Sequence, residues 1–521
     1  MKNLAAIILF LGLACQVKTI QAETNPMAII PLPMKIEKRD GSFVITPETT
    51  ILVTRDTRRT GEYLARLLEP GTGLNLQVQE YSQPDRETGC IVLRTTPDLE
   101  QLGPEGYELK VLNDRVLLNA PTLAGIFYAC QTLRQLLPPA IEKKEIQKAA
   151  RVIPQVEIAD RPRFKWRGLM LDCSRTFQTV DYLKRYIDLL AYYKLNVFHL
   201  HLTDDQGWRV EIKRYPKLVT VGSEFAGRYH TPGGYYTQEE IKQLVGYASS
   251  RNVTLVPEIE MPGHCLAALA SYPELSCTGG PFEIYPFFKG PNIQENVFCA
   301  GKEATFEFLE NVLNEIAGLF PCEYVHIGGD EVPKTIWKKC EKCQARIREQ
   351  GLRDEEELQS YFVRRIESSL KTKNRRLIGW DEILEGGLAP EATVMSWRGM
   401  KGGVAAASEG HDVIMSPTSH CYLDYDYETT SVEKAYSFDP IPPELPTEKR
   451  KHILGLQGNM WTHIATNEDA TDRQVFPRII ALAEVGWSAA ELRDWAGFYK
   501  RLVLHYPRLE AMGVKYFVAE P

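Results

Sequence analysis

Eight short apolar runs constrain the fold of this 521-residue chain more than any other feature of its sequence. Amphipathic stretches of helical length separate most of these runs. Continuous Val, Ile and Leu character is typical of parallel strands that are buried on both faces. The pattern predicts an α/β fold, a (β/α)8 TIM barrel. The runs are Gly168–Leu171, Val197–Leu202, Thr254–Ile259, Tyr324–Ile327, Arg376–Gly379, Thr393–Ser396, Asp412–Met415 and Ile453–Leu456.

Polar and aromatic residues follow each run. Barrel enzymes place their active sites at the carboxyl ends of the strands, so these residues are candidates for one shared site. Eight such endings in register are far stronger support than one. The candidates are Arg175, Asp204, Asp205, His264, Asp330, Glu331, Trp380, Trp397, Tyr422, Asp424 and Trp461.

Asp330 and Glu331 are adjacent and follow an apolar run and two glycines. An isolated Asp-Glu pair is usually a solvated acidic turn, but this pair lies in the middle of the polar ring. Most glycosidases place two carboxyl groups on opposite sides of the scissile bond, which adjacent residues would do awkwardly. The pair suits a mechanism in which a 2-acetamido carbonyl attacks the anomeric carbon, one carboxylic acid protonates the leaving oxygen and the other orients the amide. Two like charges so close would raise one pKa.

The other candidates fit recognition of a sugar. Any one Trp is usually core packing, but Trp380, Trp397 and Trp461 at strand ends favour a carbohydrate pocket. Arg175 offers donors for hydroxyl groups, while Tyr422 and Asp424 can bond an acetamido oxygen and a hydroxyl. His264 is expected to orient an acid, with Asp204 or Asp205 in its network and the other holding a loop. His199 and His201 lie within a strand and are interpreted as structural, and no metal or cofactor is expected.

A different pattern precedes Val156. Alternating strands are predicted at Ser42–Ile45, Thr50–Val53, Cys90–Arg94 and Tyr107–Val111, with helices at Thr60–Leu68 and Thr122–Leu137. This predicts a small α+β domain over residues 23–156, ahead of a catalytic barrel over residues 157–521.

The first 22 residues resemble a signal peptide, with Lys2, an apolar run over Leu4–Ala14 and a small residue, Ala22, at the expected cleavage point. The protein is therefore expected to be exported, periplasmic or secreted. Lipid attachment at Cys15, giving an outer-membrane lipoprotein, is the alternative. No other segment is long and apolar enough to predict a transmembrane helix. A net charge of −7 and a pI near 5.9 argue against nucleic acid as a partner.

Besides Cys15, four of the 11 cysteines carry specific expectations. Cys277 and Cys299 flank a loop rich in Gly, Pro and Phe, and are the best disulfide candidates in an exported protein. Cys340 and Cys343 look like half of a zinc site, but no second pair follows at zinc-ribbon spacing. We interpret them as structural or free thiols.

Three longer strings resemble family 20 glycoside hydrolases, the β-N-acetylhexosaminidases. They are Gly125–Leu137 (GIFYACQTLRQLL), His199–Arg209 (HLHLTDDQGWR) and His326–Val332 (HIGGDEV). The resemblance covers nearly the whole mature chain. It implies exo-cleavage of terminal N-acetylglucosamine or N-acetylgalactosamine, with retained configuration through an oxazolinium intermediate. It assigns Glu331 as general acid/base and Asp330 as the acetamido-orienting carboxylate. It also implies that Arg175, Asp424 and Trp461 contact the sugar, that Tyr422 bonds the acetamido carbonyl and that Trp380 and Trp397 line the acetamido pocket.

Two positions depart from the family pattern. The first strand is followed by Arg175-Thr-Phe177 where Arg-His-Phe is usual, and the eighth by Trp461-Thr-His463 where Trp-Thr-Glu is usual. In the family, this Glu accepts hydrogen bonds from sugar hydroxyls. The imidazole of His463 cannot replace a carboxylate in that role. We hypothesise that His463 improves tolerance of a 6-O-sulfated N-acetylglucosamine; neutral drift is the alternative.

Two other functions compete with this one. A non-catalytic sugar-binding protein on the same scaffold would be expected to lack Asp330 or Glu331. An enzyme of the same mechanism that releases a disaccharide would need a pocket open beyond one sugar. In each case the partner is a glycan, and oligomeric state is left open.

Overall fold

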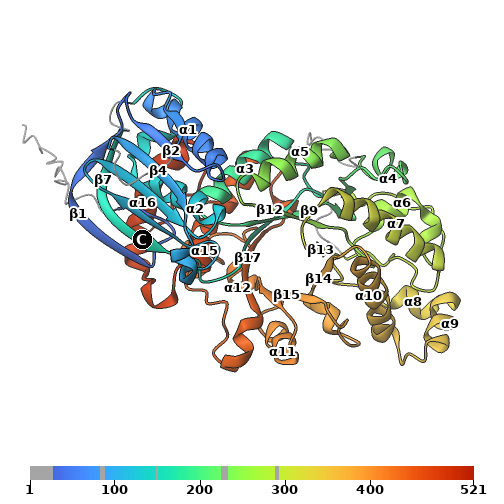
Figure 1. Cartoon of the computed structure of the whole chain (residues 1–521). Coiled ribbons are helices and arrows are strands. Elements are labelled where there is room, and N and C mark those ends of the chain that lie inside the picture. Colours follow the sequence, from blue (N-terminus) through green and yellow to red (C-terminus); the bar gives the residue numbers. More distant parts are fainter. Residues whose placement is uncertain (1–26, 82–87, 148–150, 225–232, 288–292, 521) are drawn as a thin grey trace, which may run out of the picture.

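The computed structural model describes residues 27–81, 88–147, 151–224, 233–287 and 293–520. A mixed sheet from the first third of the chain lies beside a barrel formed by the rest (Figure 1). The predicted signal peptide, with Cys15, lies outside the described residues. Within the described ranges, no helix is long and apolar enough to cross a membrane.

The predicted barrel is confirmed. Eight parallel strands close in the order β12-β13-β14-β15-β16-β17-β8-β9. Every predicted run overlaps one of them, and most strand residues are buried, as expected for strands covered on both faces. The strands are β8 (Trp166–Asp172), β9 (Val197–His201), β12 (Thr254–Glu258), β13 (Tyr324–His326), β14 (Arg376–Trp380), β15 (Thr393–Ser396), β16 (Val413–Met415) and β17 (Ile453–Met460).

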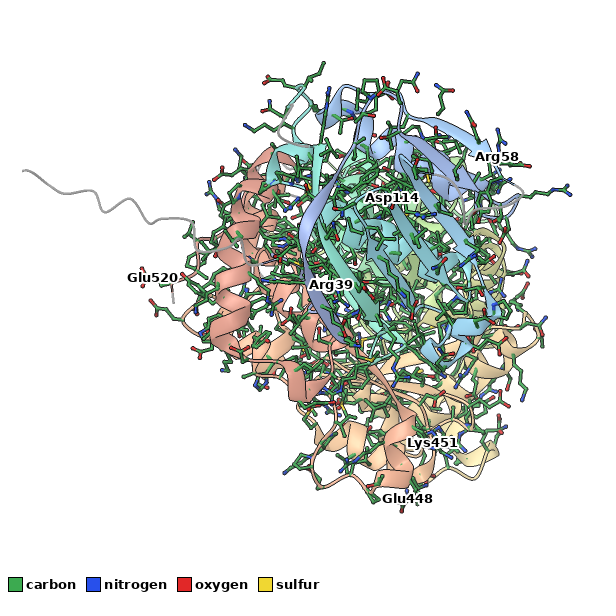
Figure 2. The ribbon with its side chains drawn as sticks, turned by 60° about the vertical axis from the view of Figure 1, so that its left-hand side comes forward. Arg39, Arg58, Asp114, Glu448, Lys451 and Glu520 are labelled. Carbon is green, nitrogen blue, oxygen red and sulfur yellow. The ribbon has the colours of Figure 1, made fainter. Side chains whose placement is uncertain are left out.

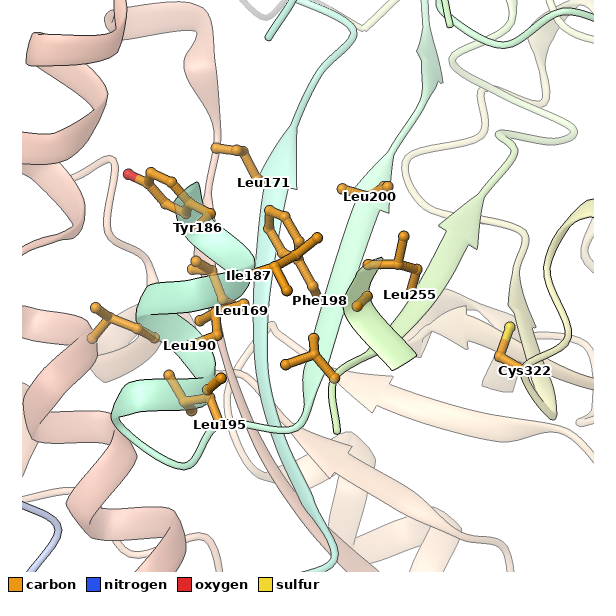
Figure 3. Packing of buried hydrophobic residues seen from close by; sticks show 14 of the residues in the cluster. Leu169, Leu171, Tyr186, Ile187, Leu190, Leu195, Phe198, Leu200, Leu255 and Cys322 are labelled. Atoms are coloured by element: carbon orange, nitrogen blue, oxygen red, sulfur yellow. The ribbon is translucent and has the colours of Figure 1, made fainter. Parts of the chain in front are cut away.

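Helices surround the barrel and bury their apolar faces against it. Ile187 of α3 belongs to the same buried cluster as Leu169 of β8 and Phe198 of β9 (Figure 3). The longer helices are α3 (Val180–Tyr192), α5 (Gln238–Ser249), α7 (Glu303–Leu319), α10 (Glu355–Lys371), α15 (Arg478–Trp487) and α16 (Trp495–Ala511). Shorter ones are α4 (Lys217–Thr220), α6 (Leu266–Ser271), α8 (Thr335–Lys339), α9 (Glu341–Glu349), α11 (Lys401–Glu409), α12 (Thr418–Cys421), α13 (Val432–Tyr436) and α14 (Glu468–Val475).

The N-terminal sheet has seven strands in the order β1-β7-β5-β6-β4-β2-β3. Its strands are β1 (Lys35–Val44), β2 (Thr50–Val53), β3 (Gln77–Glu80), β4 (Cys90–Thr95), β5 (Tyr107–Val111), β6 (Arg115–Ala120) and β7 (Val152–Asp160), with helices α1 (Arg58–Thr72) and α2 (Leu123–Leu136). The four predicted strands and both predicted helices overlap these elements, whereas β3, β6 and β7 were not predicted. Strand β7 runs through residue 156 and pairs with β1 and β5 of this sheet.

A buried polar cluster joins the sheet to the barrel. Asp160 at the end of β7 accepts hydrogen bonds from Lys194 Nζ at 2.9 Å, Tyr107 Oη at 2.6 Å and Trp487 Nε1 at 3.0 Å. The Lys194 and Asp160 side chains are almost fully buried, and each compensates the charge of the other. Either charge buried alone would destabilise the fold. Charged side chains such as Arg39 and Arg58 instead lie on the outer surface of the N-terminal domain (Figure 2).

Candidate active site

The turn after β13 places two carboxyl groups at the mouth of the barrel. Gly328 and Gly329 have φ of 70° and 90°, and Glu331 itself has φ of 47°. A Cβ at Gly328 would lie 1.6 Å from Glu260 Oε2, so any side chain here would have to displace the Glu260 carboxyl group and also adopt a positive φ, which favours glycine. Asp330 is mostly buried, and the Glu331 side chain is 37% exposed.

His264 lies between this pair and the acids that follow β9. Its Nε2 is 3.6 Å from Asp330 Oδ2 and 3.4 Å from Glu331 Oε2. Its Nδ1 is 3.5 Å from Asp204 Oδ1 and 3.3 Å from Asp205 Oδ2. Asp205 also accepts a hydrogen bond from the Leu266 N–H at 2.9 Å. Both aspartates therefore face His264, and Asp205 also holds the loop that carries it.

The environment separates the pKa values of these groups. Burial raises the pKa of Asp330 to about 6 despite the nearby His264. A hydrogen bond with His264 lowers the pKa of Glu331. Burial acts to lower the pKa of His264, but the charges of Asp204 and Asp330 outweigh burial and raise it well above its ordinary value. In the free protein, therefore, Asp330 has the higher pKa of the two adjacent carboxyl groups.

Arg175 forms another part of the pocket wall. Its Nη2 is 2.7 Å from Asp204 Oδ2, and its Nε donates to Gln206 at 3.1 Å. Its guanidinium carbon lies 4.9 Å from the centre of the Trp461 ring, which adds a cation–π contact. This arrangement holds the donors of a buried arginine at the pocket wall.

Aromatic rings enclose a pocket of about 250 Å³ beside the carboxyl pair. Trp397 and Tyr422 stack with ring centres 6.0 Å apart, and Trp380 and Trp461 meet at 5.9 Å. The volume lies below the usual range of about 300–1,000 Å³ for sites of drug-sized ligands, so the pocket suits one small ring. The lining residues are Arg175, His264, Asp330, Glu331, Trp380, Trp397, Tyr422, Asp424, Tyr425, Trp461 and His463.

Besides His264 Nδ1, which faces Asp204 and Asp205, three buried polar atoms of pocket residues have no hydrogen-bond partner among the described residues. The atoms are Asp330 Oδ1, Asp424 Oδ1 and His463 Nδ1. Burial raises the pKa of Asp424 to about 7. Burial, aided by the charge of Arg175, lowers the pKa of His463, which favours the neutral ring. A polar ligand could form hydrogen bonds with all three atoms. Because a buried polar atom without a partner costs free energy, such bonds would favour binding.

The structure adds supporting residues that the sequence did not single out. Glu258 is fully buried and accepts a hydrogen bond from Trp380 Nε1 at 2.9 Å. His201 Nδ1 lies 2.5 Å and His199 Nε2 lies 3.2 Å from its carboxylate. Glu382 likewise accepts from Trp397 Nε1 at 2.9 Å. Each carboxylate fixes the orientation of one pocket tryptophan. Both glutamates lie at strand ends, but nothing local distinguishes them from other acids there.

Both histidines of β9, His199 and His201, are fully buried. His201 bridges Glu258 and Asp204, since its Nε2 lies 2.9 Å from Asp204 Oδ2. Tyr425, which was not predicted, lines the pocket near Tyr422, with ring centres 5.8 Å apart.

The structure does not contain the predicted disulfide between Cys277 and Cys299, because neither residue forms an S–S bond in it. Cys277 Sγ instead lies 3.7 Å from Cys343 Sγ, and Cys299 Sγ lies 3.7 Å from Cys343 Sγ and 3.8 Å from Cys340 Sγ. The fold brings all four cysteines together, so the pairwise interpretation missed a single cluster.

Both domains of the chain match models of known protein families. Residues 164–490 match "Glycosyl hydrolase family 20, catalytic domain", and residues 26–161 match "Glycosyl hydrolase family 20, domain 2". The chain is 43% identical over 529 residues to a "Beta-hexosaminidase" of Porphyromonas gingivalis, covering 98% of this chain and 67% of that protein. It is 33% identical over 511 residues to a "Beta-N-acetylhexosaminidase" of Cellulomonas fimi, covering 94% and 96% of the two chains.

Solved structures give the same result. The GH20 beta-N-acetylhexosaminidase from Streptomyces coelicolor A3(2) superposes with a TM-score of 0.84 at 36% identity, over 96% of this chain and 99% of that chain. The beta-N-acetylhexosaminidase from Bacteroides fragilis NCTC 9343 gives a TM-score of 0.82 at 33% identity, over 94% and 97%.

Proposed function

Because this chain belongs to glycosyl hydrolase family 20, we propose that its pocket removes one terminal N-acetylated amino sugar at a time, with retained anomeric configuration. The observation that carries the proposal is the small aromatic pocket with Asp330 and Glu331 at its edge. One sugar ring fills such a pocket, so the bond to be cleaved would lie at its mouth, near the half-exposed Glu331.

The proposed reaction uses the substrate's own acetamido group. Its carbonyl oxygen attacks the anomeric carbon while the bond from that carbon to the leaving oxygen breaks, and Glu331 gives its proton to the leaving oxygen. Asp330 accepts a hydrogen bond from the amide N–H and stabilises positive charge in the oxazolinium ring. Water then loses a proton to Glu331 and attacks the anomeric carbon, which reopens the ring and restores the acetamido group.

Substrate binding would reverse the order of the two pKa values. Glu331 is exposed in the free protein, and a sugar over it removes water from its carboxylate, which raises the pKa. The free Oδ1 of Asp330 would gain the amide N–H as a partner, which lowers the pKa of that carboxyl. The proton of the pair therefore moves to Glu331 when the acetamido group is in place.

Two substitutions and two leaving groups test this division of roles. Glu331→Gln should lose about 10²–10⁴-fold in kcat/KM on a phenyl β-N-acetylglucosaminide, but much less on a dinitrophenyl one, which leaves without a proton. Asp330→Asn should slow both to a similar degree, because it acts on the acetamido group. The control is Glu349→Gln, an exposed change at the end of α9 that should leave both rates intact.

A chito-oligosaccharide distinguishes the competing functions. We expect single N-acetylglucosamine units as the first product, since the pocket holds one ring. Disaccharide as the first product would favour the disaccharide-releasing alternative. Binding of the oligosaccharide without any cleavage would favour a sugar-binding protein and would refute the proposed enzyme reaction.

We also propose that His463 adjusts the pocket toward a 6-O-sulfated sugar. His463 lines the pocket, and its Nδ1 has no partner among the described residues. A neutral ring can donate one hydrogen bond to a sulfate, whereas a carboxylate at this position would repel it. His463→Glu should lower the ratio of kcat/KM for sulfated over plain substrate at least several-fold. An unchanged ratio would indicate neutral drift.

Export of the protein is a further proposal, supported by Lys2 and the apolar run over Leu4–Ala14. We expect cleavage after Ala22 and a periplasmic or secreted mature chain. Intact mass of protein purified from the native host checks the site. A mass that fits an acylated Cys15 as the first residue would support the outer-membrane lipoprotein instead.

A further inference from the structure

Four cysteines from three separate segments meet outside the pocket. Their sulfur atoms all lie within 4.8 Å of one another. The three shorter separations are 3.7 Å from Cys343 to Cys277, 3.7 Å from Cys343 to Cys299 and 3.8 Å from Cys299 to Cys340. The sulfurs do not divide into two couples, as two disulfides with S–S bonds of about 2.05 Å would require.

These separations are those of a tetrahedron around a metal. Zinc binds cysteine sulfur at about 2.3 Å, so two sulfurs on a tetrahedral zinc lie about 3.8 Å apart. Sites with four cysteines and no open position are structural zinc sites. We propose that Cys277, Cys299, Cys340 and Cys343 bind one Zn²⁺, which replaces our expectation that the protein needs no metal.

The surrounding backbone is arranged to hold these four ligands. Cys340 and Cys343 lie at the start of α9, where helix N–H groups favour negatively charged sulfur. A Cβ at Gly301 would lie 2.2 Å from the carbonyl carbon of Lys342, so only glycine lets the Cys299 segment approach this turn. The backbone N–H of Gly301 also interacts with the sulfur of Cys299.

Hydrogen bonds fix the segments that carry Cys277 and Cys299. The N–H of Cys299 donates to Leu275 O at 3.0 Å, and Ser276 and Phe298 form an antiparallel bridge. Trp337 Nε1, from α8, donates to Phe298 O at 3.0 Å. The ligands are therefore brought together by packing that is independent of the sulfur atoms.

The position of the cluster suggests what the metal does. It joins the long connection after β12, which contains His264, to the segment after β13, where Cys340 follows Glu331 by nine residues. A zinc ion here would fix both loops of the catalytic face without touching substrate. Its proposed role is structural, and the proposal does not depend on the sugar that the pocket accepts.

Metal content of the purified protein tests the site directly. We expect about one zinc per chain by inductively coupled plasma mass spectrometry after exhaustive dialysis against EDTA. Cys277→Ser and Cys343→Ser should lose the zinc. The control is Cys322→Ser, since Cys322 lies elsewhere and its thiol donates to the Tyr324 carbonyl at 3.0 Å, as a hydroxyl can.

A spectroscopic test remains available if the variants do not fold. Wild-type protein produced in cobalt medium should show the intense absorption of tetrahedral Co²⁺ bound to thiolates. Absence of metal, together with an intact mass four hydrogens below that of the fully reduced chain, would indicate two disulfides and overturn the proposal. Absence of metal with every thiol free, or iron in place of zinc, would overturn it as well.

Discussion

Gly328 is the position where one methyl group should disturb the catalytic turn most. Its φ of 70° costs a residue with a Cβ about 1–2 kcal/mol. The new Cβ would also lie 1.6 Å from Glu260 Oε2, and overpacking of this kind adds about 1–3 kcal/mol. Gly328→Ala should therefore lower the free energy of unfolding by about 2–5 kcal/mol. Because Asp330 is two residues away, a shift of about 1 Å there could reduce kcat about 10²-fold.

Gly513→Ala separates strain from clash. Gly513 has a similar φ of 76°, and a Cβ there would have no heavy atom of the described residues within 4 Å apart from its own chain neighbours. It should cost only the backbone strain, about 1–2 kcal/mol, and leave kcat intact. Urea denaturation and kcat on an aryl β-N-acetylglucosaminide measure both effects. Equal destabilisation by the two variants would refute the argument, as would an unchanged kcat in Gly328→Ala.

The remaining predictions concern protons and buried charge. In the free protein, the Asp330–Glu331 pair loses its last proton at about pH 6. Because no protonated carboxyl group then remains to act as the acid, kcat/KM should fall as pH rises above 6. A flat profile up to about pH 8 would contradict this. Asp160→Asn leaves the buried Lys194 without its counter-charge and should destabilise the protein by about 3–5 kcal/mol, measured by urea denaturation. Burial lowers the pKa of His505 to about 3, below its unfolded value of 6.5. As pH falls, the unfolded chain therefore binds a proton at His505 before the folded protein does. The contribution of His505 to stability is complete above pH 6.5, and up to about 1.4 kcal/mol of it is lost per pH unit as pH falls toward 3. His505→Gln should lose less stability than wild type over that range, and parallel losses would exclude this source.

The barrel was predictable because its strands are short, apolar and buried on both faces, so each run stands out from its polar surroundings. Strand β3 was not predicted for the opposite reason. Its residues at Gln77–Glu80 are mostly exposed at the edge of the sheet, and they show no apolar pattern. Strand β7 gives no separate signal because it lies at the junction of the two domains, where the sequence pattern changes.

The pocket residues were predictable to a similar extent. Asp330, Trp397 and Asp424 directly or closely follow apolar runs, and parallel strands in a barrel bring such ends to one face. Glu258 and Glu382 also lie at strand ends, but their roles depend on which indole each one contacts. Those contacts depend on side-chain directions that no local pattern encodes.

The sequence by itself determined the barrel, the helices around it and the adjacent carboxyl pair, because hydrophobic periodicity and the position of polar residues after strands are local properties. Only the tertiary structure decided which partners meet across the chain. It placed the raised pKa on Asp330 rather than Glu331, because burial and the position of His264 set the charge balance. It also joined Cys277 and Cys299 to Cys340 and Cys343, since residues tens of positions apart meet only when two loops pack together.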